Sequence, residues 1–278
     1  MIAILGTGLL GANFGRALVK KGETVHVWNR TPARARALEA DGMTAFERAA
    51  DAVKGADRVH IAVADDAAVD GILAQAQLAP GQLVLDHTTT STAGARTRTA
   101  RTDITYVHAP VFMGPKNALE STGMMMVSGD RARVARVTPL LEPMTGTLVD
   151  FGERVDAAAA YKLMGNTFLM GFVTAIGDLL GLGKAMGIAP KDAIALFEHF
   201  NPAQFTMPRA KSLVAAKFDT PSWELAMARK DARLVMGEVD QAHLALTLVP
   251  AIAAKMDAMI AAGHAHDDWT VIAKDFVA

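Results

Sequence analysis

The amino-acid sequence predicts an α/β fold with a doubly wound parallel sheet, followed by an all-helical C-terminal part. In the first half, short apolar runs alternate with helical segments, and this alternation is typical of parallel strands joined by right-handed crossovers. From about Val155 the pattern changes to helical segments only. The 278 residues are long enough for two domains, which we place at 1–154 and 155–278.

The predicted elements follow one another closely. Strands are expected at the short apolar runs, residues 2–5, 24–28, 58–63, 82–86, 105–109, 123–128 and 147–151. Helices of the first half are expected at residues 12–21, 66–75, 91–100 and 131–141. Helices of the second half are expected at residues 156–186, 190–200, 207–216, 222–241 and 247–262. Ligands of such sheets bind beyond the carboxyl ends of the strands.

A glycine-rich segment, residues 6–11 (GTGLLG), lies between the first strand and the first helix. This context, with a second strand at the expected distance, is what a dinucleotide-binding fingerprint of the Rossmann type requires. Gly6 permits the tight turn, Gly8 lets a pyrophosphate approach the backbone, and Gly11 lets the helix pack closely on the strand. The free N–H groups of the helix then face the phosphates. The residues expected against the cofactor here are Gly6, Gly8, Leu9, Leu10 and Gly11.

The end of the second strand indicates which dinucleotide binds. NAD sites usually carry an Asp or Glu there, which accepts hydrogen bonds from the ribose hydroxyls. This chain instead has Asn29, Arg30 and Thr31, with Arg34 and Arg36 following. A guanidinium pairs with a 2′-phosphate, whereas a carboxylate repels it. We therefore expect NADP(H) to be preferred over NAD(H).

Composition narrows the class of protein. The formal net charge is −1 and no basic stripe is present, which argues against nucleic-acid binding. The chain has no cysteine, so it has no disulfides and no thiol catalysis. It begins directly with an apolar strand, which leaves no room for a signal peptide. We expect a soluble, cytoplasmic enzyme.

The longest predicted helix, residues 156–186, is mostly apolar. Four polar side chains interrupt it: Lys162, Asn166, Asp178 and Lys184. It therefore has no clean run of about 20 apolar residues, and we do not expect it to cross a membrane. We expect a helix buried between the two domains, with a role in subunit contacts.

Lys162 and Asn166 are four residues apart on this helix and therefore project from one face. A lysine among apolar residues is costly unless it is paired or used, and desolvation lowers its pKa toward values suited to proton transfer. By spacing alone, a lysine that extends its ammonium to solvent fits equally well. The pair Lys230-Asp231 is, by itself, typical of a solvated charge pair.

In their order, these motifs resemble those of the β-hydroxyacid dehydrogenases, which include 3-hydroxyisobutyrate dehydrogenase, tartronate semialdehyde reductase and the glyoxylate and succinic semialdehyde reductases. The resemblance covers nearly the whole chain and implies the type of NAD-binding domain found in 6-phosphogluconate dehydrogenase. Residues 6–11 and 29–31 are similar to the family's cofactor motif in its NADPH-preferring form. Three further residues fall at the family's loop against the cofactor: Val63, Ala64 and Asp65.

The resemblance also implies roles for residues in the substrate site. Residues 86–89, with Arg96, are similar to the family's substrate segment, where Thr88 contacts the substrate and Thr89 the nicotinamide side. Lys162 and Asn166 match the catalytic lysine and its asparagine partner. Lys230 matches a lysine that reaches the cofactor.

One segment departs from the family pattern, residues 108–114 (HAPVFMG). Phe112 stands where the family has a serine that helps to hold a substrate carboxylate, and Met113 replaces a glycine. Our hypothesis is that the substrate lacks the carboxylate, holds it differently, or places an apolar group here. The residues expected against the substrate are Thr88, Thr89, Phe112, Met113 and Gly114.

The implied chemistry is hydride transfer between a nicotinamide and a carbonyl carbon, which interconverts a hydroxy acid or related alcohol and its aldehyde. Lys162 would act as general acid in reduction and as base in oxidation. No metal is expected, because the lysine ammonium supplies the electrophile. The histidines and aspartates of residues 264–268 form only a weak ligand pattern. A homodimer or homotetramer is expected from the resemblance and from the apolar long helix.

Two alternatives stay open. Imine reductases are similar in the glycine loop, in residues 29–31 and in the long helix, but usually carry an Asp, a Tyr or another residue where Lys162 stands. The apolar Phe112 mildly favours that alternative. A dinucleotide-binding sensor without catalysis is the other, and the pairing of Lys162 with Asn166 argues against it.

Overall fold

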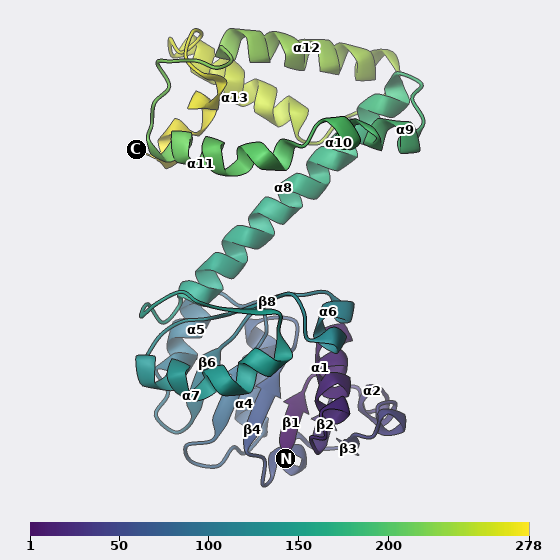
Figure 1. Cartoon of the computed structure of the whole chain (residues 1–278), viewed down its shortest axis with the longest axis vertical. Coiled ribbons are helices and arrows are strands. Elements are labelled where there is room, and N and C mark those ends of the chain that lie inside the picture. Colours follow the sequence, from purple (N-terminus) through teal and green to yellow (C-terminus); the bar gives the residue numbers. More distant parts are fainter. Residues whose placement is uncertain (278) are drawn as a thin grey trace. The chain divides into compact units, whose positions relative to one another are not determined.

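The computed structural model describes residues 1–277 and confirms the predicted fold class. A six-stranded, entirely parallel sheet has the order β3-β2-β1-β4-β5-β6 (Figure 1). Its strands are β1 (Ile2–Leu5), β2 (Val25–Trp28), β3 (Thr44–Phe46), β4 (Arg58–Ile61), β5 (Leu83–Asp86) and β6 (Thr105–His108). The order reverses between β1 and β4, which is the point where doubly wound sheets bind ligands.

Helices cover both faces of this sheet because alternate side chains of each strand point to opposite sides. Ile2 and Ile4 of β1 belong to one apolar core, and Ala3 and Leu5 belong to another. The helices of this part are α1 (Leu9–Lys20), α2 (Pro32–Arg36), α3 (Ala49–Val53), α4 (Asp66–Gln75), α5 (Thr92–Thr99), α6 (Pro115–Glu120) and α7 (Arg131–Leu141). Short 3₁₀ turns lie at Glu39–Asp41 and Glu142–Met144.

The first unit also contains a second, separate sheet of three strands. It has the order β7-β8-β9, made of β7 (Val111–Phe112), β8 (Met124–Val127) and β9 (Thr147–Asp150). The sequence pattern placed the last two strands in one parallel series with the others, and this was wrong. The two-residue β7 runs antiparallel to β8 and carries Phe112 opposite Met124.

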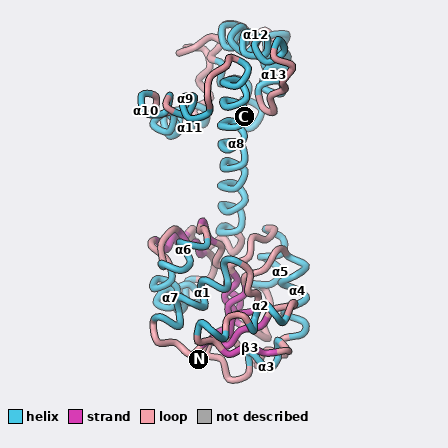
Figure 2. The backbone as a smooth tube through the Cα atoms, turned by 90° about the vertical axis from the view of Figure 1, so that its right-hand side faces the viewer, coloured by secondary structure: helices cyan, strands magenta, loops and turns pink. Residues whose placement is uncertain are grey.

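The remaining elements are helical. They are α8 (Ala157–Ala185), α9 (Pro190–Ile194), α10 (Leu196–His199), α11 (Thr206–Val214), α12 (Leu225–Gln241) and α13 (Val249–Ala261), with 3₁₀ turns at Pro202–Phe205 and Trp269–Phe276 (Figure 2). The chain forms two compact units, Met1–Asn166 and Thr167–Ala278, so α8 contributes to both. In the second unit the buried Asp178 carboxylate accepts the Thr247 and Leu248 N–H groups at 2.7 and 2.8 Å and fixes the start of α13.

The apolar surface of α8 differs from expectation. The predicted helix was a buried one, yet many of its large apolar side chains are exposed: Leu163, Met164, Phe168, Leu169, Met170, Phe172 and Val173. By length and composition alone, α8 is also apolar enough to cross a membrane. A helix buried in the interface between two copies of the chain can have the same length and apolar composition, since a subunit interface and a membrane both favour apolar side chains.

Candidate active site

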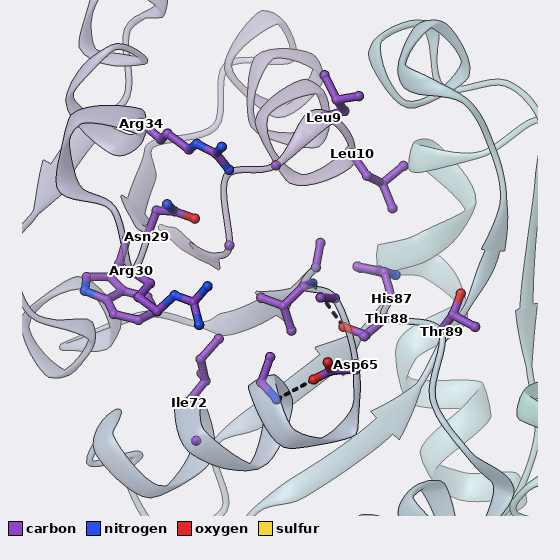
Figure 3. Close-up of a pocket in the computed structure, with 18 of the residues that line it drawn as sticks. Leu9, Leu10, Asn29, Arg30, Arg34, Asp65, Ile72, His87, Thr88 and Thr89 are labelled. Atoms are coloured by element: carbon purple, nitrogen blue, oxygen red, sulfur yellow. Dashed lines mark hydrogen bonds between the residues drawn. The ribbon is translucent and has the colours of Figure 1, made fainter.

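A cavity of about 850 Å³ lies in the first unit at the carboxyl ends of β1, β2, β4 and β5 (Figure 3). Most of the predicted site residues line it: Gly6, Gly8, Leu9, Leu10, Asn29, Arg30, Thr31, Val63, Ala64, Asp65, Thr88, Thr89, Met113 and Lys162. Gly11, Phe112, Gly114, Asn166 and Lys230 are not among the lining residues. The fold therefore brings predicted residues from distant segments of the sequence together around one pocket.

Each of the three glycines in the loop has a different structural role. Gly6 has φ +101°, and a Cβ there would lie 2.4 Å from the Ala62 carbonyl oxygen. A Cβ at Gly11 would lie 2.0 Å from the carbonyl oxygen of Gly6, so Gly11 acts by packing and not by lining the cavity. A Cβ at Gly8 would meet nothing within 4 Å. The space over Gly8, at the start of α1, is the cradle that a pyrophosphate needs.

Asn29 holds the glycine loop in place. Its Oδ1 accepts the Thr7 N–H at 3.1 Å, and its Nδ2 donates to the Thr31 carbonyl at 3.1 Å. With its side chain engaged in this way, Asn29 is a bridge between β2 and the loop. Figure 3 shows Arg30 and Arg34 extending into the pocket beside it.

Two arginines supply the positive charge of this end of the pocket. Arg30 and Arg34 line the cavity, and neither forms an ion pair with any residue in the range 1–277. Arg36, by contrast, is paired with Glu47 through an Nε–Oε1 hydrogen bond of 3.0 Å. Arg30 and Arg34 are thus the guanidinium groups free to meet an anionic ligand. Arg34 was noted in the sequence but not included among the predicted contacts.

Beneath the pocket lies a buried chain of imidazoles. His87 lines the cavity, its Nδ1 lies 2.8 Å from the Ala109 carbonyl, and its Nε2 lies 2.9 Å from His60 Nδ1. Because a carbonyl only accepts, we assign the proton to Nδ1 of His87, and Nε2 then accepts from His60. His60 Nε2 in turn accepts from Arg58 Nε at 3.2 Å. Both nitrogens of His87 are engaged, so it is not an acid or base for the pocket.

Burial lowers the pKa of His87 to about 4, and burial together with His87 and Arg58 lowers the pKa of His60 well below its usual value. An unfolded histidine titrates near pH 6.5. As the pH falls below that value, the unfolded chain binds protons that the native chain does not, so the native state loses stability down to about pH 4.

We therefore expect the free energy of unfolding to fall as the pH drops from 7 to 5, by roughly 2 kcal/mol from His87 alone. Urea unfolding at several pH values, above the range where carboxylates titrate, measures this. A free energy of unfolding that stays constant between pH 7 and pH 5 would contradict the assignment.

The two threonines that follow His87 differ in what they can offer a ligand. Thr88 is buried, and its Oγ1 accepts the Val63 N–H at 3.1 Å, which ties the β5 end to the loop after β4. Thr89 is half-buried and lines the cavity. The hydroxyl of Thr89 is therefore better placed than that of Thr88 to contact a ligand.

Asp65, which also lines the cavity, caps α4 by accepting the Ala68 N–H at 2.8 Å (Figure 3).

Lys162 reaches the cavity from the first turns of α8. Burial lowers its pKa, and no carboxylate among residues 1–277 pairs with it. Its Nζ lies 4.0 Å from the centroid of the Phe112 ring, which is a cation–π contact. Asn166 is half-buried one helical turn away. A desolvated ammonium of this kind can hold a developing oxyanion and exchange a proton with it.

Other predicted residues lie elsewhere. Lys230 is on α12 in the second unit, where its Nζ is 2.9 Å from Asp231 Oδ1, and its contact with a cofactor stays a prediction. His264 pairs with Asp267 at 2.6 Å and His266 with Glu224 at 3.2 Å.

Several lining residues were missed by sequence reasoning. They are Trp28, Ala62, Ala67, Ala68, Gly71, Ile72, Gln75, Val111 and Pro115. Those on α4 share one face of the helix that follows β4, and the small residues among them, Ala67, Ala68 and Gly71, are the signal that a ligand passes close to the backbone.

The fold and the pocket together define the class: a dinucleotide-binding protein with its site at the switch point of a parallel sheet. The family described as the NAD binding domain of 6-phosphogluconate dehydrogenase matches residues 1–152, which is more than half of the chain. The chain belongs to this family and, with its hydroxyacid-dehydrogenase relatives, to the β-hydroxyacid dehydrogenases. It is an NAD(P)-dependent oxidoreductase, and its relatives are named as dehydrogenases that act on hydroxy groups.

Its relatives span nearly its full length. A probable 3-hydroxyisobutyrate dehydrogenase of Mycobacterium bovis is 29% identical over 98% of this chain and 96% of its own. An NAD-dependent L-serine dehydrogenase of Pseudomonas aeruginosa is 27% identical over 99% of this chain and 97% of its own. The solved structure of an imine reductase from Myxococcus stipitatus in complex with NADP+ has a TM-score of 0.90 at 20% identity and covers 99% of both chains. At that identity the similarity concerns the fold.

Proposed function

We propose that this protein uses NADP(H) to interconvert a hydroxy compound and its aldehyde or ketone, with Lys162 as general acid and base. The observation that carries the proposal is the Lys162 ammonium: it is half-buried, has no carboxylate partner within residues 1–277, and lies at the wall of the pocket that the glycine loop opens. Such an ammonium is suited to exchange a proton with a substrate oxygen.

The pocket residues fit a dinucleotide. The open space over Gly8 would take the pyrophosphate, and the amides at the start of α1 would donate to it. Arg30 and Arg34 support a 2′-phosphate at the adenosine end. The names of the similar proteins give no single cofactor, since one is an NAD-dependent enzyme and another was solved with NADP+. The support for NADP(H) therefore comes from these two arginines.

The bound nicotinamide would supply or accept the hydride at the substrate carbon. In reduction, the Nζ of Lys162 donates a hydrogen bond to the carbonyl oxygen and transfers its proton there as the carbon gains the hydride, which gives the alcohol. In oxidation, the neutral amine takes the hydroxyl proton. Asn166 would hold the same oxygen, and Thr89 would orient the nicotinamide side.

A turnover assay tests the proposal directly. Oxidation of NADPH, compared with NADH, would be followed with succinic semialdehyde, glyoxylate, tartronate semialdehyde, an aromatic aldehyde and a cyclic imine. We expect NADPH-dependent turnover of at least one carbonyl compound. Tight NADPH binding without turnover of any of them would count against the proposal.

Cofactor preference gives a separate prediction. Arg34→Ala should raise the Kd of NADPH about tenfold and leave that of NADH nearly unchanged, because a charge-assisted hydrogen bond to the 2′-phosphate is lost. Arg36→Ala is the matched control, since Arg36 is paired with Glu47 outside the pocket. Fluorescence titration of both cofactors measures the effect, and an equal loss for NADPH and NADH would contradict it.

Imine reduction is the second candidate function. It is favoured by the apolar ring of Phe112 beside Lys162, which suits a substrate without a carboxylate. The presence of a lysine favours carbonyl reduction instead. Turnover of the cyclic imine, faster than that of every carbonyl compound in the same assay, would select the second candidate.

We further propose a cytoplasmic homo-oligomer, a dimer or tetramer, that buries the exposed apolar side chains of α8. Sedimentation should then give a multiple of the chain mass of 29.4 kDa. Recovery of the protein only with membranes would contradict this proposal and would indicate instead that α8 inserts into a membrane.

A further inference from the structure

A contact between β7 and α8 is tighter than ordinary packing. A Cβ added at Gly165 would lie 2.2 Å from Phe112 Cζ and 3.0 Å from Cε1 and Cε2. The end of the Phe112 ring therefore rests directly on the backbone of α8, at a position where every other residue type would displace it. Glycine inside a helix is less favourable than alanine, and the contact with the Phe112 ring explains why position 165 nevertheless carries glycine.

The same ring also covers the ammonium one turn earlier on the helix. Lys162 Nζ lies 4.0 Å from the ring centroid. The backbone of Phe112 is fixed by its antiparallel pairing with Met124 of β8. Phe112, Gly165 and Lys162 therefore form one contact set, which we call the ring seat.

From the ring seat we infer that Phe112 is a specificity-determining residue that keeps carboxylates away from Lys162 and admits carbonyl compounds whose neighbouring group is uncharged and apolar. A carbonyl oxygen needs a single donor, which the ammonium still provides. A carboxylate has two oxygens and a full charge, and when the carbonyl oxygen already occupies the ammonium, a carboxylate against the ring is buried without a further side-chain donor, which is strongly unfavourable. The ring, with Val111 and Met113 beside it in sequence, offers no side-chain donor there.

This inference rests on the proposed function for its substrate but is tested in two ways. The first is discrimination between two matched aldehydes, succinic semialdehyde and 4-methylpentanal, in which an isopropyl group has the shape of the carboxylate. The wild type should have the higher kcat/KM with 4-methylpentanal. Phe112→Ser should shift the ratio about 10- to 100-fold toward succinic semialdehyde, while Phe112→Leu should keep the apolar preference.

The second test needs no turnover. In protein labelled with ¹³Cε-lysine and loaded with NADPH, the Hε resonance of Lys162, assigned with Lys162→Arg, should be shifted upfield by the ring beneath it. The shift should vanish in Phe112→Leu and shrink in Gly165→Ala, whose methyl displaces the ring. Butyrate should perturb this resonance in Phe112→Ser and leave it unchanged in the wild type.

The outcomes separate the two proposals. Absence of any turnover in the wild type, with the NMR results as expected, overturns the proposed function and keeps the ring seat. Turnover with an unchanged aldehyde ratio in Phe112→Ser, or butyrate binding at Lys162 in the wild type, overturns the specificity role. The thermal midpoint and the Kd of NADPH show that each variant is folded.

Discussion

Replacing Lys162 with methionine should lower kcat/KM about 10²- to 10⁴-fold while the Kd of NADPH stays the same, because the proton donor is lost and the dinucleotide contacts are not. Methionine keeps the unbranched apolar stem of the side chain, one atom shorter, and removes only the ammonium with its cation–π contact to Phe112. Steady-state kinetics and NADPH titration measure the two quantities.

Two controls define what the Lys162 result means. Lys162→Arg keeps the positive charge but holds its proton too tightly, so it should restore little of the rate. The exposed Lys54, changed to methionine, should behave as the wild type. Full activity of Lys162→Met would remove the lysine from the chemistry.

The glycine loop should give two opposite phenotypes. Gly11→Ala places a methyl 2.0 Å from the Gly6 carbonyl oxygen, and since both atoms are fixed by backbone we expect a loss of about 1–3 kcal/mol in the free energy of unfolding. Gly8→Ala meets open space, so the fold should lose at most about 1 kcal/mol through the helix cap.

The same Gly8 methyl fills the cradle for the pyrophosphate, and we expect the Kd of NADPH to rise about 100-fold. Urea unfolding and fluorescence titration of both variants separate the two effects. Equal stability and equal binding in Gly8→Ala would show that the pyrophosphate lies elsewhere.

The fold could be predicted best where a local signal marks an element. The predicted bounds of α4 and α7 agree with the structure, and each begins after an aspartate that caps it: Asp65 accepts the Ala68 N–H and Asp130 the Arg133 N–H, both at 2.8 Å. Helix α1 begins at Leu9 and not at residue 12, because Gly8 within the glycine loop is its N-cap.

Elements without such signals were missed. Strand β3 has three residues and β7 has two, which is too short for a period of two to be recognised. Missing β7 also meant that β8 and β9 were placed in the wrong sheet. Pairing partners are set by tertiary contacts, and no local pattern in residues 123–151 distinguishes the two sheets.

In the candidate site, too, features with a local sequence signal could be predicted, and features that depend on tertiary contacts could not. Glycines, arginines and Lys162 could be located in the sequence because their chemistry is specific to residue type. The contact of Phe112 with Gly165 could not, since it requires a two-residue strand to meet a helix about 50 residues further along.

Asn29 has a consequence for engineering. A redesign toward NAD could place an acid at the end of β2, where NAD sites usually carry one. Here an aspartate at position 29 could still accept the Thr7 N–H, but its other oxygen would face the Thr31 carbonyl, which now receives a hydrogen bond from Nδ2. The repulsion would loosen the glycine loop, where we propose that the pyrophosphate binds, whichever cofactor was bound. Redesign toward NAD would therefore begin at Arg30 and Arg34, which line the pocket and form no ion pair within residues 1–277.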